Sequence, residues 1–555
     1  MRQVVKDIFI ILQYREKRKL WLLALADTCI SLLDIIFLIA LLYVINFYIQ
    51  PLHTIAAGHF SFNLFDTHPV LLITLFFLLF AVKNMAGFMI SKMQYRFVYS
   101  VASRISRQNL DQYLTGRFYD YINTDSSVAH RRISQEPIEF AHYVLNGVQQ
   151  LFSQLVLVMV TIAAVLIFNP LLFPLLLILL APPVFWVSFL MKRRLDAASR
   201  QAKRTSEQTI QHLQEALTGF VESNIYRKHD FFIGRYLRFQ ERLNHYLSER
   251  LIIQNLPPRL IEAFAVFGLL ILVLVNFFTE PGKSIPLVTI GALMVAAYKI
   301  IPGIVKITNT AGQVKTYAFA ATDLAATTLL PGKRTCSNES IDSICFDNVC
   351  FSYPDAKIIR SLTFMIKRGD FAVVAGISGK GKTTLVNLLL GFLTQDAGVV
   401  CVNGRQADAA TRQGYWAGIA YVKQQNFMLH ASIAENITLQ EDEYDHEKIE
   451  EIAALTGVDA FTCLLPGGLH SIITENGKNF SGGQRQRINF ARALYRNFDL
   501  LILDEPFSEL DEQSELLMLR QLQKIAAQGK MVLLITHNKN ALSFCNKKIL
   551  MNEGE

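Results

Sequence analysis

The sequence predicts an all-α membrane domain with six spans, followed by an α/β domain of the soluble kind. Its 555 residues are more than one hydrophobic core usually organises, so at least two domains are expected. Hydrophobic residues make up 52% of the chain and the mean hydropathy is +0.29, which is high for a soluble protein. These residues concentrate before about residue 306, and shorter apolar runs follow. This change in composition places the membrane domain first.

Six apolar stretches are long enough to cross a bilayer, for which a helix needs about 20 residues. They are Trp21–Phe47, Pro69–Ile90, Leu151–Phe168, Leu171–Met191, Leu260–Phe278 and Pro286–Val305. Only Asn169-Pro170 separates the third stretch from the fourth, which predicts a helical hairpin. A short turn at residues 279–284 joins the fifth stretch to the sixth.

The formal net charge of +8 lies beside the spans. Lys and Arg crowd the N-terminus and the two long loops after the second and fourth spans, whereas residues 49–68 contain neither. The positive-inside rule then places both termini and both loops in the cytosol. The loops are amphipathic, so we expect helices that extend into the cytosol and turn back near Arg117–Tyr121 and Glu222–Lys228; two small soluble insertions are the alternative. This distribution argues against nucleic acid as a partner.

The seven cysteines show no C-x-x-C spacing, so neither a zinc site nor a redox motif is predicted. Six of them lie in the C-terminal part, where we expect reduced thiols facing the cytosol. No cleavable signal peptide is expected, because the N-terminus is basic and the first apolar run is too long for an h-region.

A phosphate-binding loop follows the apolar strand Phe371–Ala375. It reads Gly376-Ile377-Ser378-Gly379-Lys380-Gly381-Lys382-Thr383-Thr384, which is G-x-x-x-x-G-K-[ST] between a strand and a helix. Backbone N–H groups at such a helix N-terminus bind phosphate. We expect Lys382 to neutralise the β- and γ-phosphate oxygens and Thr383 to offer its hydroxyl to Mg²⁺.

A second strand is followed by two acidic residues that suit the same chemistry. The buried-type strand Leu500–Leu503 ends in Asp504-Glu505-Pro506. We expect Asp504 to hold Mg²⁺ and Glu505 to polarise the attacking water. Apolar residues before Asp-Glu are a weak signal alone, but they are a strong one in the same domain as the phosphate loop. Together they predict a nucleoside triphosphate hydrolase.

The deciding motif is Phe480-Ser481-Gly482-Gly483-Gln484, which precedes a helix. It resembles the Leu-Ser-Gly-Gly-Gln signature of ABC-transporter ATPases, with Phe480 in place of the leucine. Its backbone amides at a helix N-terminus suit phosphate. Lys380 departs from the family pattern, because that position is usually small; it could strengthen phosphate binding or face a partner subunit.

The resemblance implies roles for further residues. Tyr353 matches the aromatic residue that stacks on adenine, and Gln424 matches the glutamine that reaches Mg²⁺ and senses the membrane domain. Asp511, in Ser508-Glu509-Leu510-Asp511, belongs to a segment that resembles the dimer-contacting D-loop. His537 matches the switch histidine on the γ-phosphate, and Thr474-Glu475-Asn476-Gly477 is similar to a segment found in exporters. The catalytic set implied is Glu505, His537 and Gln424.

With six spans ahead of the ATPase motifs, the whole chain resembles half-size ABC exporters. The implied fold is a six-helix ABC exporter domain with long cytosolic helical extensions at 1–320, a linker at 321–340 and an α/β P-loop ABC ATPase domain at 341–555. The implied cofactors are ATP and Mg²⁺. The implied partner is a second copy or a closely related half-transporter, with each ATP site built from one phosphate loop and the other chain's signature. The implied location is the inner (plasma) membrane, with the ATPase domain cytosolic.

The implied function is export or flipping by alternating access. Three stretches, Ser31–Asp34, Leu256–Glu262 and Glu475–Gly477, are loosely similar to bacterial flippases for lipid-linked oligosaccharides. Export of drugs, other lipids or peptides is the alternative. An ATP-gated channel or a regulatory subunit is an alternative of another class; such proteins can lose the catalytic carboxylate, which this chain keeps as Glu505.

Three charged residues lie inside the first two spans. Asp27 and Asp34 are seven apart on one helix face, and Lys83 is in the second span. Each costs about 2.5–3.5 kcal/mol at the bilayer centre, so partners are expected. Counting the helical rise from the cytosolic ends places Lys83 about 3 Å in depth from Asp27 and roughly 7–8 Å from Asp34. We therefore predict that Asp27 pairs with Lys83 and that Asp34 lines the substrate path; a purely structural Asp–Lys pair is the alternative.

Overall fold

The computed structural model of the chain describes most of both predicted domains. It describes residues 2–49, 69–116, 118, 122, 125–168, 194–195, 197–198, 200–279, 287–328, 339–353, 356–375, 381–441, 443–474 and 477–551. The chain divides into two compact units. The first comprises Met1–Leu114 and Thr124–Pro331, and the second comprises Thr115–Asn123 and Gly332–Glu555.

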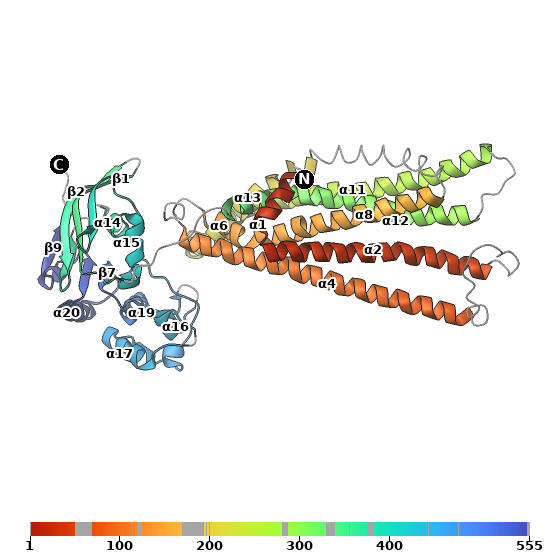
Figure 1. Ribbon diagram of the computed structural model, residues 1–555. Helices are drawn as coiled ribbons and strands as arrows, with labels where there is room; N and C mark the ends of the chain where they lie inside the picture. The colour runs from red at the N-terminus through yellow and green to blue at the C-terminus, as the bar shows by residue number, and fades with distance from the viewer. Residues whose placement is uncertain are drawn as a thin grey trace. The chain divides into compact units, whose positions relative to one another are not determined.

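The secondary structure of the first unit's described residues is all helix, with short turns between helices (Figure 1). Its helices are α1 (Arg2–Ile11), α2 (Tyr14–Ile49), α4 (Pro69–Thr115), α6 (Ser126–His130), η1 (Arg131–Gln135), α7 (Glu136–Glu139), η2 (Phe140–Leu145), α8 (Asn146–Phe168), α10 (Phe220–Ile225), α11 (His229–Thr279), α12 (Leu287–Thr316) and α13 (Ala318–Thr328). Residues 126–168 form one run of helix in which two π-helical segments, η1 and η2, flank Pro137.

Three helical stretches of the described residues are long and apolar enough to cross a membrane: Tyr14–Phe37, Ile73–Thr115 and Ser126–Ala163. They overlap the first three predicted spans. The predicted fifth span lies in α11, and the sixth, from Leu287 onward, lies in α12, whereas the fourth, Leu171–Met191, lies outside the described residues. The turn predicted at Glu222–Lys228 contains the end of α10 and lies directly before α11; most of the turn predicted at Arg117–Tyr121 is outside the described residues.

Helices α2 and α4 pack in one antiparallel register. Near the start of α2, the side chain of Arg104 donates to Glu16, with Nε 2.7 Å from Oε1. Further along, a Cβ on Gly87 would lie 3.4 Å from Ile30. Lys83 then forms its ion pair with Asp34.

The predicted pairing of Asp27 with Lys83 is therefore wrong, since Lys83 contacts Asp34. Asp34 lies two turns, about 10 Å, further along α2 than Asp27. Depth was counted from the ends of the apolar runs, but α4 continues well past its apolar run, and contacts such as Arg104–Glu16 fix the stagger of the two helices. Asp34 is thus not left unpaired for a substrate, as the prediction required.

A hydrophobic core of the first unit joins α1, α4, η2 and α13. It contains Ile8 and Val101, with Ala321 and Leu324 of α13 at most 1% exposed. The small side chains of α13 let α1 lie against it, and the hydroxyl of Thr322 donates to Asp7. Residues 321–328, predicted as linker, are therefore helical and belong to this unit. The other predicted domain limits stay predictions.

The second unit contains two sheets and seven α-helices among its described residues (Figure 1). An antiparallel sheet has the order β2-β1-β4-β5, formed by Ala356–Lys367, Ser343–Tyr353, Ala397–Val402 and Arg405–Gln406. A parallel sheet has the order β6-β7-β8-β3-β9, formed by Ile419–Val422, Leu500–Asp504, Met531–Ile535, Phe371–Ala375 and Lys547–Leu550. The helices are α14 (Lys382–Leu389), α15 (Ala409–Gly414), α16 (Ile433–Thr438), α17 (His446–Thr456), α18 (Asp459–Thr462), α19 (Gly482–Tyr495) and α20 (Glu512–Ala527).

The central strands explain where the site lies. Strands β7 and β8 are buried at every position, as expected for parallel strands with both faces covered. The carboxyl ends of parallel strands share one edge, where ligands bind in open α/β sheets. Three predicted site segments follow β3, β7 and β8 at this edge.

A short segment of the first long loop belongs to the second unit. Phe118 stacks on Phe392, with ring centroids 4.6 Å apart and an interplanar angle of 28°. Phe392 in turn lies 5.0 Å from the ring of Trp416, whose Nε1 donates to the carbonyl of Leu390 at 2.8 Å. A residue from the N-terminal half of the sequence is thus part of this aromatic group.

Candidate functional site

Four predicted site residues converge at the carboxyl edge of the parallel sheet, with Glu505 at the centre. Its Oε1 lies 3.3 Å from Lys382 Nζ and 2.8 Å from His537 Nε2. Its Oε2 accepts a hydrogen bond from Gln424 Nε2 at 2.8 Å. Two cationic or cationisable groups and one amide therefore share a single carboxylate.

The backbone at Glu505 is unusual. Its φ of +50° puts a non-glycine residue in the left-handed region, and its N–H donates to the carbonyl of Ile535 at 2.9 Å. Such a conformation costs on the order of 1–3 kcal/mol and persists where the surroundings impose it, often at functional sites. Here the buried strand β7 ends at Asp504, and the turn directs Glu505 back over the edge of the sheet.

Lys382 begins α14 and is 6% exposed. Gly381 precedes it with φ +87°, and a Cβ there would lie 2.3 Å from Ile358 Cγ2, so only glycine fits. The remaining predicted loop residues, Gly376–Lys380, lie outside the described residues. Thr384, in the first turn of α14, is also buried.

Asp504 and Thr383 fit a divalent cation. Asp504 is 3% exposed, and the Thr383 hydroxyl donates to its Oδ2 at 3.4 Å. Burial and the adjacent Glu505 charge raise the pKa of Asp504 by more than the Thr383 hydroxyl and the Lys382 charge lower it. A hydroxyl and a carboxylate are oxygen ligands of the kind that Mg²⁺ takes, and a cation there would favour the ionised carboxylate.

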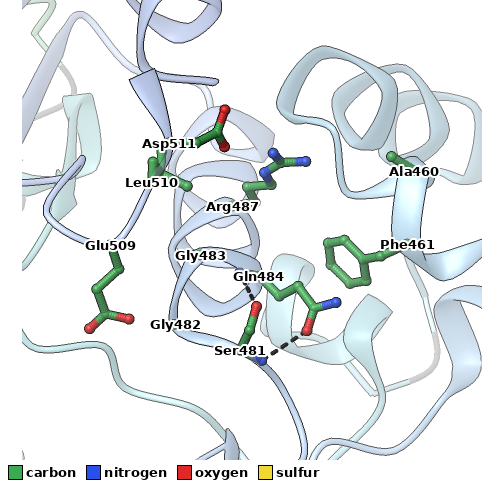
Figure 2. A pocket seen from close by; sticks show the side chains of 10 residues that line it. All are labelled: Ala460, Phe461, Ser481, Gly482, Gly483, Gln484, Arg487, Glu509, Leu510 and Asp511. Carbon is green, nitrogen blue, oxygen red and sulfur yellow. Dashed lines mark hydrogen bonds between the residues drawn. The ribbon is translucent and has the colours of Figure 1, made fainter. Parts of the chain in front are cut away.

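The predicted signature residues form the N-terminus of α19 (Figure 2). Ser481 is the N-cap: its Oγ accepts from the Gln484 backbone N–H at 3.3 Å, and its own N–H donates to Gln484 Oε1 at 2.8 Å. This reciprocal capping box fixes the first turn of the helix. The sequence Ser-Gly-Gly-Gln therefore encodes its own helix start.

A pocket of about 530 Å³ opens at this helix start (Figure 2). It is lined by Ala460, Phe461, Ser481, Gly482, Gly483, Gln484, Arg487, Glu509, Leu510 and Asp511. A Cβ on Gly482 would lie 1.4 Å from Glu509 Oε2, so any larger residue there would require the flexible Glu509 carboxylate to move. Asp511 caps α20 by accepting from the Ser514 N–H at 3.1 Å. The structure thus brings the predicted signature and Asp511 together, but the pocket lining includes neither Glu505 nor the three residues around it.

Tyr353 ends β1 and is 40% exposed. Its ring packs edge-to-face on Phe351, with centroids 5.0 Å apart. The Tyr353 ring is therefore packed against Phe351 on one part of its surface and remains accessible for stacking on another.

Sequence reasoning missed Arg487 and Glu509, which line the signature pocket. Helical spacing offered a signal for Arg487, because it lies three residues after Gln484 and so shares its face. Glu509 lies in the predicted D-loop segment, but its position against Gly482 depends on tertiary packing.

Comparison with known proteins identifies the class. Residues 359–508 match the ABC transporter family. The structure of a bacterial Atm1-family ABC exporter with ATP bound superposes with a TM-score of 0.76 over 97% of this chain and 93% of that chain, at 16% identity. The second unit is therefore an ABC transporter ATPase domain, in a chain with the fold of an ABC exporter. The predicted family resemblance and fold class are confirmed.

Particular relatives differ in how much of the chain they cover. A putative export ATP-binding/permease protein of Rickettsia bellii is 37% identical over 215 residues, which is 38% of this chain and 37% of that protein. The chain thus matches well under half the length of this relative. An ATP-dependent lipid A-core flippase of Polaromonas sp. is 27% identical over 551 residues, covering 96% of this chain and 89% of the flippase.

Proposed function

We propose that this chain is one half of an ATP-driven exporter or flippase, and that two copies pair head to tail around two ATP sites. The separation of the Glu505 cluster from the signature pocket carries this proposal, because no described residue belongs to both. Each is half of an ATP site of the kind that the resemblance implies. A second copy turned head to tail supplies the missing signature.

An exposed apolar surface around α10 also supports a partner. Leu217, Phe220, Val221, Ile225 and Phe231 are each between 57% and 71% exposed. Soluble surfaces rarely gather so many large apolar side chains in one short segment without a covering partner. We assign this surface to the ATPase domain of the second copy, as in a domain-swapped dimer.

The residues at the sheet edge perform the hydrolysis. In the proposed nucleotide-bound state, Lys382 and His537 turn from Glu505 to the γ-phosphate, whose charge attracts both. Glu505, freed from them, accepts a proton from the attacking water while Gln424 orients it. Tyr353 stacks on adenine. Mg²⁺ held by Thr383 and Asp504 would neutralise phosphate charge as it develops.

The transported substrate crosses the inner membrane by alternating access, with both termini and the ATPase domain in the cytosol. The likeness to the Polaromonas flippase over 96% of this chain supports a lipid-linked oligosaccharide or another amphiphile as the substrate. Drugs and peptides are the other substrate classes. Purified chain in liposomes, tested for ATPase stimulation by lipid-linked glycans, lipids and peptides, distinguishes them; stimulation by none contradicts an exporter of these classes.

We propose that Asp34 lines the substrate path together with its partner Lys83. The pair lies in apolar helices, and Lys83 sits 4.6 Å above the ring of Phe80. Ionisable residues in membrane spans commonly mark a substrate pathway, because their cost otherwise selects against them.

A mixing experiment tests the head-to-tail sites. Forced heterodimers of a Lys382→Ala chain with a Ser481→Ala chain retain one intact site, so we expect ATPase activity. The control pairs a chain carrying both substitutions with an unmodified chain, which leaves no intact site in a head-to-tail dimer. Activity in the control together with inactivity of the first mixture would mean that each chain holds its own complete site, and the arrangement would be wrong.

A further inference from the structure

The residue after His537 is held in place by a buried glutamate. Asn538 Nδ2 lies 2.6 Å from Glu515 Oε1 and 2.7 Å from its Oε2. Glu515 is 6% exposed, and among the described residues it forms no salt bridge. Desolvation by burial raises the pKa of Glu515, so this carboxylate is kept at a cost in free energy.

The rest of Asn538 is fixed as well. Its backbone N–H donates to Thr536 Oγ1 at 3.0 Å, and its Oδ1 accepts from the Asn540 N–H at 3.0 Å. The amide therefore caps the short helix η6 (Lys539–Ser543) on one side and binds Glu515 on the other. Because His537 is the adjacent residue, these bonds determine where its backbone places the imidazole.

On the Glu515 side, this contact is connected to the signature pocket. Glu515 follows Ser514 in the first turn of α20. The Ser514 hydroxyl donates to Asp511 Oδ1 at 2.6 Å and accepts from Arg487 Nη2 at 2.7 Å. Arg487 and Asp511 both line the pocket (Figure 2). A continuous chain of bonds therefore runs from the pocket, through the first turn of α20, to the residue beside His537.

We propose that Glu515 is a positioning residue for His537, which it holds through Asn538, and that the first turn of α20 links this position to the signature pocket. The inference rests on the proposed head-to-tail dimer. There, His537 of one chain meets the ATP bound by its own Lys382, while its Asp511 and Arg487 meet the other ATP. Occupation of one site shifts α20 and, through Glu515, sets His537 for hydrolysis at the second.

The first test measures ATP hydrolysis by the full-length protein in liposomes. Glu515→Leu removes the contact and fills the same space, so we expect kcat to fall about tenfold while the KM for ATP changes little. The control is Glu512→Gln, an exposed residue of the same turn, which should leave both unchanged. The double variant Glu515→Gln with Asn538→Asp exchanges the hydrogen-bond donor and acceptor, so it should restore most of kcat. Asn538→Asp alone places two carboxylates together and should be the least active variant.

A double-mutant cycle separates positioning from simple stability. If Glu515 acts through His537, then Glu515→Leu causes no further loss in a His537→Ala protein. The Hill coefficient for ATP should also fall toward one in Glu515→Leu. An unchanged kcat in Glu515→Leu, or an equal fold-loss with and without His537, overturns the inference. Failure of the unmodified chain to hydrolyse ATP would instead contradict the proposed function.

Discussion

Two lysine–carboxylate contacts in this chain occupy very different surroundings. Lys382 meets Glu505 at the edge of a parallel sheet, where His537 and Gln424 contact the same carboxylate. Lys83 meets Asp34 between two apolar helices, with the rings of Phe80 and Phe37 beside the ammonium group.

The two contacts differ in how easily each carboxylate can give up its cationic partner. Glu505 has several polar partners at the edge of the sheet. A bound phosphate can therefore attract Lys382 and His537 away from Glu505, which is then free to act as a base. The pair of Lys83 and Asp34 sits in an apolar setting, where separation of the charges is expensive. The first contact is thus suited to a reaction cycle, and the second to holding two helices in register or admitting a charged substrate.

The largest effect is expected at the sheet edge. Glu505→Gln keeps the shape but loses the base, so ATP hydrolysis should fall by about 100-fold while ATP binding persists and dimers accumulate with ATP bound. Radiolabelled ATP retention and steady-state hydrolysis measure the two. Hydrolysis above a few per cent of the unmodified rate would show that Glu505 is not the base.

Lys382→Ala serves as the contrasting variant at the same place. It removes the charge that meets the phosphates, so nucleotide binding itself should be lost. If Lys382→Ala still bound ATP but did not hydrolyse it, Lys382 would act only in the chemical step, and the contrast with Glu505 would be weaker.

Sequence predicted this site far better than the membrane pair, for a physical reason. Lys382, Glu505 and His537 each come after a buried strand, and parallel strands bring their carboxyl ends together whatever the loops contain. The capping box at Ser481 is likewise local. Glu509 beside Gly482, and Asn538 on Glu515, depend on packing between segments, which no local pattern records.

The stagger of α2 and α4 illustrates the same limit. Hydropathy located both helices, but their relative depth depends on contacts such as Glu16 with Arg104, far from the charges in question. An error of roughly 7–8 Å in relative depth was enough to favour Asp27 over Asp34 as the partner of Lys83. Phe118 also escaped prediction, because nothing in its loop indicates an aromatic partner some 270 residues later.

The second largest effect is expected at the membrane pair. Asp34→Asn leaves Lys83 without its counter-charge, which should lower stability by about 3 kcal/mol in lipid, seen as a reduced melting temperature in nanodiscs. Asp27→Asn is the matched control on the same helix face and should be nearly neutral. The double variant Asp34→Leu with Lys83→Met should regain stability.

Transport assays then separate the two roles of the pair. If the stable double variant still shows substrate-stimulated ATPase activity, Asp34 and Lys83 are structural and the proposed place in the substrate path is wrong. Loss of stimulation with intact basal activity supports that place. Equal losses for Asp27→Asn and Asp34→Asn would contradict the observed pairing.

The smallest effect is expected at Phe118, which the structure groups with the ATPase unit although it belongs to the loop between membrane helices. Phe118→Leu removes the stacking on Phe392 but keeps an apolar side chain, so the cost should be about 1 kcal/mol. The Glu505 cluster is built from other segments, so basal ATPase activity should persist. Substrate-stimulated activity should fall, because a weaker contact transmits less of any movement in the loop.

Phe392→Leu removes the same stacking from the other side and should have the same effect as Phe118→Leu. If Phe118→Leu lowers basal and stimulated rates equally while Phe392→Leu does neither, the aromatic contact is not the link between this loop and the ATPase unit.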